Sequence, residues 1–404
     1  MARTQLDSTI DDIAIAMLRI QGLASAKISA HLSLDAAEVS RSLKRTKGRL
    51  WKSGGFVEGP GMALLAPDLK LSADDRVRGR AMRAIKPIQL RQLAKSELPH
   101  LRTVTVIPAR NALLPDPDSN NWRAWMEVFA RNAVPRLRDL LATGNVWGVT
   151  WGSHVAAVVD ALGHEADGKR RRRRNVSVLP LCGNRFGDRR VSESSSAIAE
   201  RLGLELAGTV TAPGALTMVP AFILGDLSDE QTLPMFMHIG RSTGYCEIFG
   251  AERIPEAVRP PASAGPAWVS RLDGVLTSVS RDGFPFGYGE NRMYENAGFK
   301  REVIDRRYLG DIGGVGLVRP EQARLPILEQ RWTGLRPEEL RACAARCTAS
   351  AGATPGVVVV ASGAERATSL LESLRNDYVN HIVIDQNLND KLVTQWLLLK
   401  DQRR

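Results

Sequence analysis

The chain has 404 residues and a formal net charge of +11 at pH 7. This length exceeds one core of usual size, so at least two domains are expected. The excess of cations favours a polyanionic partner and says nothing about the fold. No stretch of about 18 apolar residues occurs, so we expect a cytoplasmic protein without a membrane span. Four cysteines at this length favour reduced thiols over a disulfide framework or a zinc site.

The first elements expected along the chain are short helices. Apolar residues recur at helical spacing over residues 11–21 and again over residues 27–32. A tight turn at Ser33–Asp35 separates the second helix from a third, which runs from Ala36 to about Leu50. Helices joined by so short a turn predict a helix-turn-helix, whose last helix enters the DNA major groove by its N-terminal half.

The third of these helices combines a buried side with a basic side. Val39 and Leu43 stand at i and i+4 and share one side, whereas Arg41 and Lys44 leave it. This pattern predicts binding to double-stranded DNA. The residues expected to contact DNA are Lys27, Ala36, Ser40, Arg41, Lys44 and Arg45. The alternative is a small helical packing domain with a solvated charged face.

Beyond residue 100, strands and helices alternate. The expected strands are Thr103–Ile107, Val146–Thr150, Val176–Leu181, Gly274–Val279, Val357–Ala361 and His381–Asp385. The expected helices are Trp122–Leu141, Ser153–Leu162, Ser194–Leu202, Ala364–Leu374 and Asn389–Leu399. Pro135 is expected to kink or split the first helix, and Gly203 to end the third. Continuous apolar strands alternating with helices predict a doubly wound, Rossmann-like α/β domain that binds ligands at the carboxyl ends of its strands.

The predicted organisation is a helix-turn-helix domain over residues 1–58, a linker or connector helix over 59–100, and an effector-binding domain over 101–404. Six consecutive cations, Lys169–Arg174, lie between a predicted helix and a predicted strand. A solvated loop is the plain interpretation of this run, and contact with DNA or a partner is the alternative. His238 lies beside an apolar stretch and is expected in the core.

Four segments carry a resemblance to a known family. They are Gly148–His154 (GVTWGSH), Gly310–Gly314 (GDIGG), Ala361–Ala367 (ASGAERA) and Asn380–Asp385 (NHIVID). In this order behind a helix-turn-helix, they resemble the SorC family of sugar-responsive transcriptional regulators over most of the chain. The resemblance implies an effector domain akin in fold to sugar-phosphate isomerases and deaminases. It also implies a sugar or sugar phosphate as effector, homo-oligomers (dimers or tetramers) and no cofactor.

The same resemblance assigns an effector site. Gly152, Ser153 and His154 occupy its phosphate-facing turn, Arg185 follows the next strand, and Arg366 stands where a lysine is usual. The full expected set is Gly152, Ser153, His154, Arg185, Asp311, Gly363 and Arg366. Ser153-His154 replaces the usual Arg-Thr or Thr-Thr, and Arg366 offers a planar fork in place of a point charge. An effector other than a common hexose or pentose phosphate, such as an acidic or amino-sugar conjugate, is one interpretation of these differences.

The function expected is therefore a DNA-binding regulator, not an enzyme, whose operator binding depends on a small metabolite. One alternative is an enzyme of sugar-phosphate isomerase or deaminase type with an appended basic domain. Such an enzyme needs a general base, and Asp273 and Asp311 are the candidates near strand ends. A further alternative is a DNA-binding scaffold whose pocket has decayed.

Overall fold

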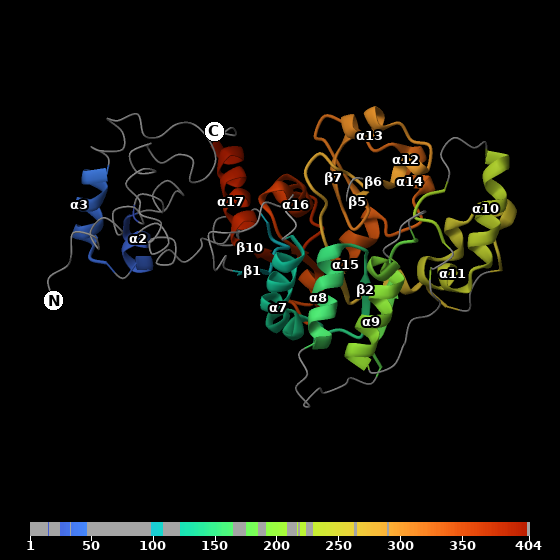
Figure 1. Ribbon diagram of the computed structural model, residues 1–404, viewed down its shortest axis with the longest axis horizontal. Coiled ribbons are helices and arrows are strands. Elements are labelled where there is room, and N and C mark those ends of the chain that lie inside the picture. Colours follow the sequence, from blue (N-terminus) through green and yellow to red (C-terminus); the bar gives the residue numbers. More distant parts are fainter. Residues whose placement is uncertain are drawn as a thin grey trace. The chain divides into compact units, whose positions relative to one another are not determined.

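The structure is a computed structural model that describes residues 15, 25–32, 34–46, 98–107, 122–164, 175–184, 191–207, 216, 219–223, 229–261, 265–288 and 291–401. The chain forms two compact units (Figure 1). The first comprises Met1–Leu90, Arg110–Leu113 and Asn389–Arg404, and the second comprises Arg91–Ala109 and Leu114–Leu388. The second unit contains a parallel sheet.

Two helices are described in the N-terminal part of the first unit, α2 (Ser25–Leu32) and α3 (Ala36–Thr46). Ile28 and Val39 are fully buried, as the apolar spacing predicts. The hydroxyl of Ser29 donates to the carbonyl of Leu34 at 2.6 Å and fixes the turn between the helices. Residues 47–50, at the expected end of the third helix near Leu50, lie outside the described residues. The expected first helix lies outside the described residues except for Ile15, which is helical and buried.

The sheet of the second unit has six parallel strands. They are β1 (Thr103–Ile107), β2 (Val146–Val149), β3 (Ser177–Pro180), β4 (Gly274–Thr277), β9 (Gly356–Ala361) and β10 (His381–Asp385). Their order is β1-β10-β9-β4-β2-β3, and every neighbouring pair is parallel. Strands β4, β9 and β10 are buried along their whole length. Such burial is expected for the inner strands of a parallel sheet that is covered on both faces. The predicted α/β fold class is confirmed.

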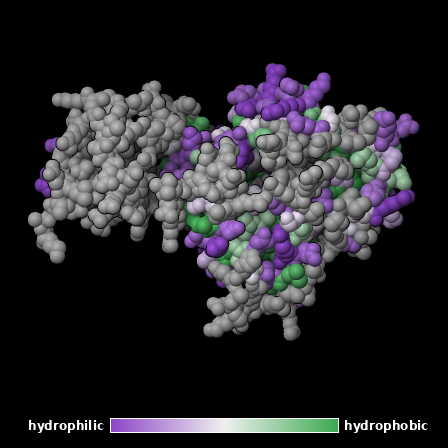
Figure 2. All heavy atoms as spheres, in the orientation of Figure 1, coloured by the Kyte–Doolittle hydropathy of each residue, from purple (hydrophilic) through white to green (hydrophobic). Residues whose placement is uncertain are grey.

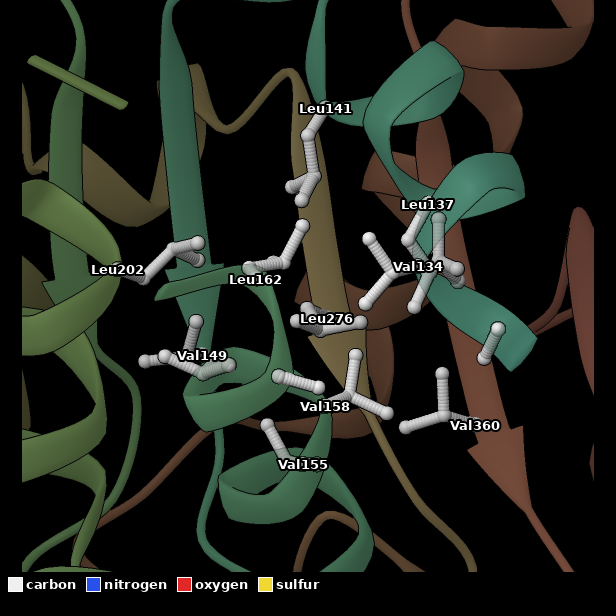
Figure 3. Close-up of a cluster of buried hydrophobic side chains, with 14 of the residues drawn as sticks. Val134, Leu137, Leu141, Val149, Val155, Val158, Leu162, Leu202, Leu276 and Val360 are labelled. Atoms are coloured by element: carbon white, nitrogen blue, oxygen red, sulfur yellow. The ribbon is translucent and has the colours of Figure 1, made fainter. Parts of the chain in front are cut away.

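One face of the sheet is covered by three helices that lie side by side, α7 (Trp122–Leu141), α8 (Ser153–His164) and α9 (Ser195–Ala207) (Figure 1). Their apolar side chains form the main core. Figure 3 shows Val134 and Leu137 of α7 and Val158 of α8 among Leu276 and Val360 of the strands. Full burial of such a side chain stabilises the fold by about 1.5–3 kcal/mol, so this layer fixes the strand ends firmly.

The remaining helices and a hairpin surround the carboxyl edge of the sheet. Helix α15 (Pro337–Ala349) packs against β4 and β9. The short turn η7 (Ala364–Arg366) leads from β9 into α16 (Ala367–Arg375), which packs against the hairpin of β7 (Tyr308–Ile312) and β8 (Val315–Val318). Helix α17 (Gln386–Asp401) follows β10 directly.

Several elements between the strands were not predicted. The helices among them are α10 (Asp229–Arg241), α11 (Thr243–Phe249), α12 (Met293–Asn296), α13 (Arg301–Arg307) and α14 (Pro326–Arg331). The others are the strands β5 (Gly287–Tyr288) and β6 (Asn291–Arg292) and the short turns η3 (Val191–Glu193), η4 (Ala251–Arg253), η5 (Glu256–Val258) and η6 (Trp268–Arg271). Figure 2 shows hydrophilic side chains gathered over α13 at the top of the view.

Three expectations for single residues differ from the structure in whole or in part. Of the two alternatives for Pro135, a split of α7 is wrong, because Pro135 lies on the exposed side of one continuous helix, where water can satisfy the carbonyl that it leaves without a donor. A kink at this residue stays a prediction. Gly203 does not end α9, which continues to Ala207. His238 is exposed near the end of α10 and is not a core residue.

Two expectations from composition have counterparts in the structure. All four cysteines are free and buried. Within the part of the chain that the structure describes, no helix has the length and apolar character needed to cross a bilayer.

Candidate functional site

The candidate site lies at the carboxyl edge of the sheet, where the direction of winding changes. After β2 the chain moves outward to its neighbour β3, whereas after β4 it moves to β9 on the other side. In open α/β sheets, such a switch point leaves a crevice beyond the strand ends in which ligands bind. The crevice between β2 and β4 is therefore the place to look for a site.

The turn after β2 contains the predicted phosphate-facing residues. Gly152 has a φ of +132°, and a Cβ there would lie 4.0 Å from the Cβ of Ser278, which follows β4. The N–H of Ala156 donates to the carbonyl of Gly152 at 2.9 Å, so α8 begins at this turn. The first N–H groups of a helix have no partner within it, so this end of α8 suits an anion or a hydroxyl. The buried Oγ of Ser278 has no hydrogen-bond partner among the described residues.

His154 connects this turn to the loop after β9. Its Nε2 accepts a hydrogen bond from the N–H of Ser362 at 3.0 Å and lies 2.8 Å from the Oγ of the same serine. Burial lowers the pKa of His154 well below its usual 6.5, and the cations of Arg366 and Arg281 lower it further. The imidazole is therefore neutral, as an acceptor must be. Burial is the main cause of this lowered pKa.

Arg366 is buried in the loop after β9. Its Nη1 donates to the carbonyl of Ser362 at 2.7 Å and to the carboxylate of Glu365. Burial lowers the pKa of Arg366 while Glu365 opposes this change. The exposed Arg281 lies 3.9 Å from the same carboxylate, measured from Nε to Oε1. Arg366 thus organises its own loop, and its contact with an effector stays a prediction.

Gly363 completes the same loop. Its φ of +96° lies in a region that side chains disfavour. Its N–H donates to Oδ1 of Asp385, at the end of β10, over 3.1 Å. Asp385 was not among the predicted site residues. Burial raises the pKa of Asp385 to about 6, and Glu365 adds to this rise.

Asp311 lies in the β7–β8 hairpin and is buried. Its Oδ2 accepts the N–H of Phe286 at 2.7 Å, and its Oδ1 accepts the N–H of Gly314 at 2.9 Å. A Cβ on Gly313, at the tip of the hairpin, would lie 2.5 Å from Oγ1 of Thr277 and 2.6 Å from Cγ2 of Thr150. The hairpin therefore packs closely on the ends of β2 and β4, with the Asp311 carboxylate turned toward backbone donors.

An aromatic cluster that the sequence did not predict supports the turn after β2. The ring centroids of Trp151 and Trp332 are 5.3 Å apart, and those of Phe222 and Trp332 are 4.9 Å apart. Phe286 and Tyr308 extend the cluster, with centroids 5.5 Å apart. Such edge-on and tilted pairs stabilise beyond their burial, so the cluster holds Trp151, and with it the Gly152 turn, in place.

Asp273 lies away from the candidate site, and Arg185 lies outside the described residues. Asp273 precedes β4, and its Oδ2 accepts the N–H groups of Asn145 at 2.6 Å and Val146 at 3.1 Å. It therefore lies at a strand end, as expected, but at the amino edge of the sheet, away from the carboxyl edge that carries the candidate site. Arg185 and the run Lys169–Arg174 lie outside the described residues.

The predicted DNA-contacting residues of α3 lie on its open side. Ala36, Ser40, Arg41 and Lys44 are exposed, whereas Val39 is fully buried. The side chains of Lys27 and Arg45 lie outside the described residues. An exposed polar and basic face backed by a buried one is what insertion into a groove requires.

The fold is that of a doubly wound α/β protein, and the candidate residues lie around the carboxyl edge of its sheet, near the switch point between β2 and β4. This fold is that of solved regulator structures. The full-length sorbitol operon regulator SorC from Klebsiella pneumoniae is 16% identical, with a TM-score of 0.50, and the match covers 96% of this chain and 99% of that one. A domain of a possible sugar-binding transcriptional regulator from Arthrobacter aurescens is 19% identical, with a TM-score of 0.51, covering 75% of this chain and 96% of that one.

A transcriptional regulator from Streptococcus pneumoniae has the same fold at 16% identity and a TM-score of 0.50, covering 78% of this chain and 97% of that one. No protein-family model and no curated protein matches the sequence. At these identities the likeness establishes the fold, and the expected resemblance to the SorC family is confirmed at that level.

Asp311 makes the stability of the fold depend on pH. Burial raises the pKa of its carboxyl to about 6, above the 3.8 of an exposed carboxyl. The folded state thus binds the proton more tightly than the unfolded state, so this group stabilises the fold fully below pH 3.8 and loses its effect as pH rises through 6. From pH 7 to pH 5, wild type should gain about 1 kcal/mol relative to Asp311→Asn.

Thermal denaturation of both proteins across this range tests the prediction. His154, whose pKa is lowered, acts in the opposite sense, and Asp385 acts in the same sense as Asp311. Because both groups are present in wild type and variant alike, only the difference between the two proteins reports Asp311. A difference that does not change with pH would contradict the assignment.

Proposed function

We propose that the chain is a transcriptional regulator whose binding to a DNA operator is controlled by a sugar, a sugar phosphate or a related metabolite. The observation that carries the proposal is the meeting of two distant segments at the switch point of the sheet. The Gly152 turn and the Ser362–Arg366 loop are joined there by His154. The sorbitol operon regulator and a possible sugar-binding transcriptional regulator share this fold, which supports assigning these residues to an effector site.

The proposal extends to the organisation of the chain. Residues 1–58 bind double-stranded DNA, residues 59–100 connect the domains, and residues 101–404 bind the effector. Gly152, Ser153, His154, Arg185, Asp311, Gly363 and Arg366 form or support the effector site. The chain acts as a homo-oligomer, because paired recognition helices are needed to read two half-sites at a fixed spacing. It acts as a regulator and not as an enzyme.

The effector class is tested with a thermal-shift panel on the purified full chain. A ligand that binds only the folded state at 100 times its Kd stabilises it by about 2.7 kcal/mol. We expect a rise in melting temperature with one class among sugars, sugar phosphates and amino-sugar conjugates. The same compound should change the affinity for an operator fragment selected from genomic DNA. A chain that binds no such fragment, with or without these compounds, would overturn the proposal.

Arg41→Ala tests the recognition helix. Arg41 is exposed on α3, where a guanidinium can contact a guanine edge, so its loss should weaken operator binding by about 1–3 kcal/mol, or roughly 5- to 150-fold. Base preference at one operator position should relax as well. Fluorescence anisotropy with operator DNA and with scrambled DNA measures both effects.

A matched control is Arg131→Ala. Arg131 is an exposed arginine on α7, 3.2 Å from the carboxylate of Glu127 on the same helix, and has no proposed role in DNA binding. Its removal should leave operator affinity unchanged. Equal losses in the two variants would mean that net charge rather than α3 determines the affinity.

The enzyme alternative depends on Asp311. Its raised pKa suits a general base, but both carboxylate oxygens already accept backbone N–H groups. We therefore assign it a structural role in the hairpin. Turnover of a sugar phosphate that is lost in Asp311→Asn, while the variant remains folded, would favour the enzyme instead.

A further inference from the structure

We infer that Asp385 couples the effector turn to the C-terminal helix α17 through a continuous set of hydrogen bonds. The term effector turn, meaning Gly152–His154, rests on the proposed function, but the coupling itself is a property of the folded chain. The path runs from His154 through Ser362 and Gly363 to Asp385 and Leu388.

The first link spans the greatest distance along the chain. His154, in the first turn of α8, accepts the N–H of Ser362, a residue 208 positions later. Both residues are buried, with His154 3% and Ser362 0% exposed. Water does not readily replace a buried hydrogen bond of this kind, so a displacement of the α8 terminus must move Ser362 or break the bond.

The second link lies one residue further. The N–H of Gly363 donates to Oδ1 of Asp385 at 3.1 Å. The register of the strands explains this contact. Ile384 pairs with Ala361, so Asp385 and Ser362, the next residues along the two chains, are neighbours. The carbonyl of Ser362 and the N–H of Gly363 belong to one planar peptide unit, so a displacement of Ser362 carries the Gly363 donor with it.

The third link reaches the helix. Oδ1 of Asp385, the same oxygen that accepts Gly363, also accepts the N–H of Leu388 in the first turn of α17 at 3.0 Å. Asp385 is 1% exposed, so a single buried oxygen joins the loop after β9 to the start of α17. A movement of the loop thus changes the acceptor on which the first turn of α17 depends.

The position of α17 gives this link a consequence. The helix starts at Gln386 in the unit that contains the sheet, and from Asn389 it is grouped with the unit of residues 1–90, which includes α2 and α3. A ligand that displaces the effector turn would therefore bias the helix that leaves the sheet. A ligand-controlled regulator needs such a connection between its ligand site and a helix outside the sheet.

Amide hydrogen exchange on the full chain, without DNA or sugar, tests the coupling. His154→Leu removes the acceptor of Ser362, whereas His154→Gln keeps an acceptor oxygen near the position of Nε2. We expect His154→Leu to speed exchange at Ser362 and, through Asp385, at Leu388 by about tenfold, the change expected for one lost hydrogen bond. His154→Gln should behave like wild type.

Variants at Asp385 test the path from its other end. Asp385→Ala should speed exchange at Leu388, Gly363 and Ser362, because coupling is reciprocal. Asp385→Asn keeps the single oxygen that accepts both donors and should restore wild-type exchange, which separates hydrogen bonding from charge. The amides of β9 serve as internal controls for global unfolding. If the β9 amides exchange faster in His154→Leu, that variant unfolds globally more often. The comparison of Asp385→Ala with Asp385→Asn then decides the result.

Faster exchange at Ser362 without a change at Leu388 in His154→Leu would overturn the inference. Faster exchange at Leu388 alone in Asp385→Ala would also overturn the inference. Because neither DNA nor sugar takes part, the result is independent of the proposed function. A chain that binds no operator can still show the coupling, and an operator-binding chain can lack it.

Discussion

Replacing Gly314 by alanine is expected to lower the free energy of unfolding by about 3 kcal/mol. Gly314 has a φ of +88°, and a Cβ there would lie 2.2 Å from Cζ2 of Trp332. The indole cannot move away freely, because its N–H donates to the carbonyl of Leu335 at 2.8 Å and its ring packs in the aromatic cluster. Backbone strain and overpacking therefore act together.

Gly283→Ala is the matched control. Gly283 also has a positive φ, +71°, but a Cβ there would meet nothing within 4 Å. It should cost only the backbone strain of a left-handed residue, about 1–2 kcal/mol. Thermal denaturation of both variants isolates the contact with Trp332. Equal losses would mean that the ring yields, and that the cluster does not hold the hairpin against the ends of β2 and β4.

Replacing Arg366 by alanine is expected to destabilise the fold by about 3 kcal/mol and to abolish the stabilisation by any compound that binds the site. Arg366 is 7% exposed, and its removal leaves the Ser362 carbonyl without its charged donor and creates a cavity. Ser362 also takes part in the link to His154, so the effector turn should loosen. Denaturation with and without the stabilising compound measures both effects.

Two further variants separate the charge of Arg366 from its shape. Arg281→Ala removes an arginine whose side chain is 43% exposed near the same Glu365, and it should change stability by less than about 1 kcal/mol. Arg366→Lys keeps the charge but cannot present a planar fork, so an intermediate loss is expected. If Arg366→Ala is as stable as wild type and is still stabilised by the compound, Arg366 neither holds the loop together nor contributes to the binding site.

The sheet was predictable because its signal is local. Val357–Ala361 is apolar at every position and His381–Asp385 has an apolar centre, Ile382–Ile384, and strands buried on both faces require such apolar runs. The helix ends were less predictable. Gly203 and Pro135 carry strong local signals for helix ends, but packing within α9 and α7 overrides both. Helix α10 contains Pro234 and α11 has only seven residues, and neither was predicted.

The site was predictable only in part, for a physical reason. The resemblance to the SorC family assigned Gly152 and Gly363 to the site, and their role in binding an effector stays a prediction. The partners of His154 and Asp385 are set by the register of the sheet and not by sequence spacing. No local pattern indicates that an imidazole will accept the N–H of a residue 208 positions away. The aromatic cluster around Trp332 was missed for the same reason, since its members come from separate loops.

The edge strand β1 has a consequence for how the chain is made. Thr103 pairs with His381, so β1 has no partner until a segment 278 residues later has left the ribosome. At roughly 5–20 residues per second, this wait lasts about 15–60 s. During synthesis β1 therefore exposes an apolar edge without a neighbour. A nascent chain that stops before β10 should be a target for chaperones and proteases, which makes the last strand a checkpoint for complete synthesis.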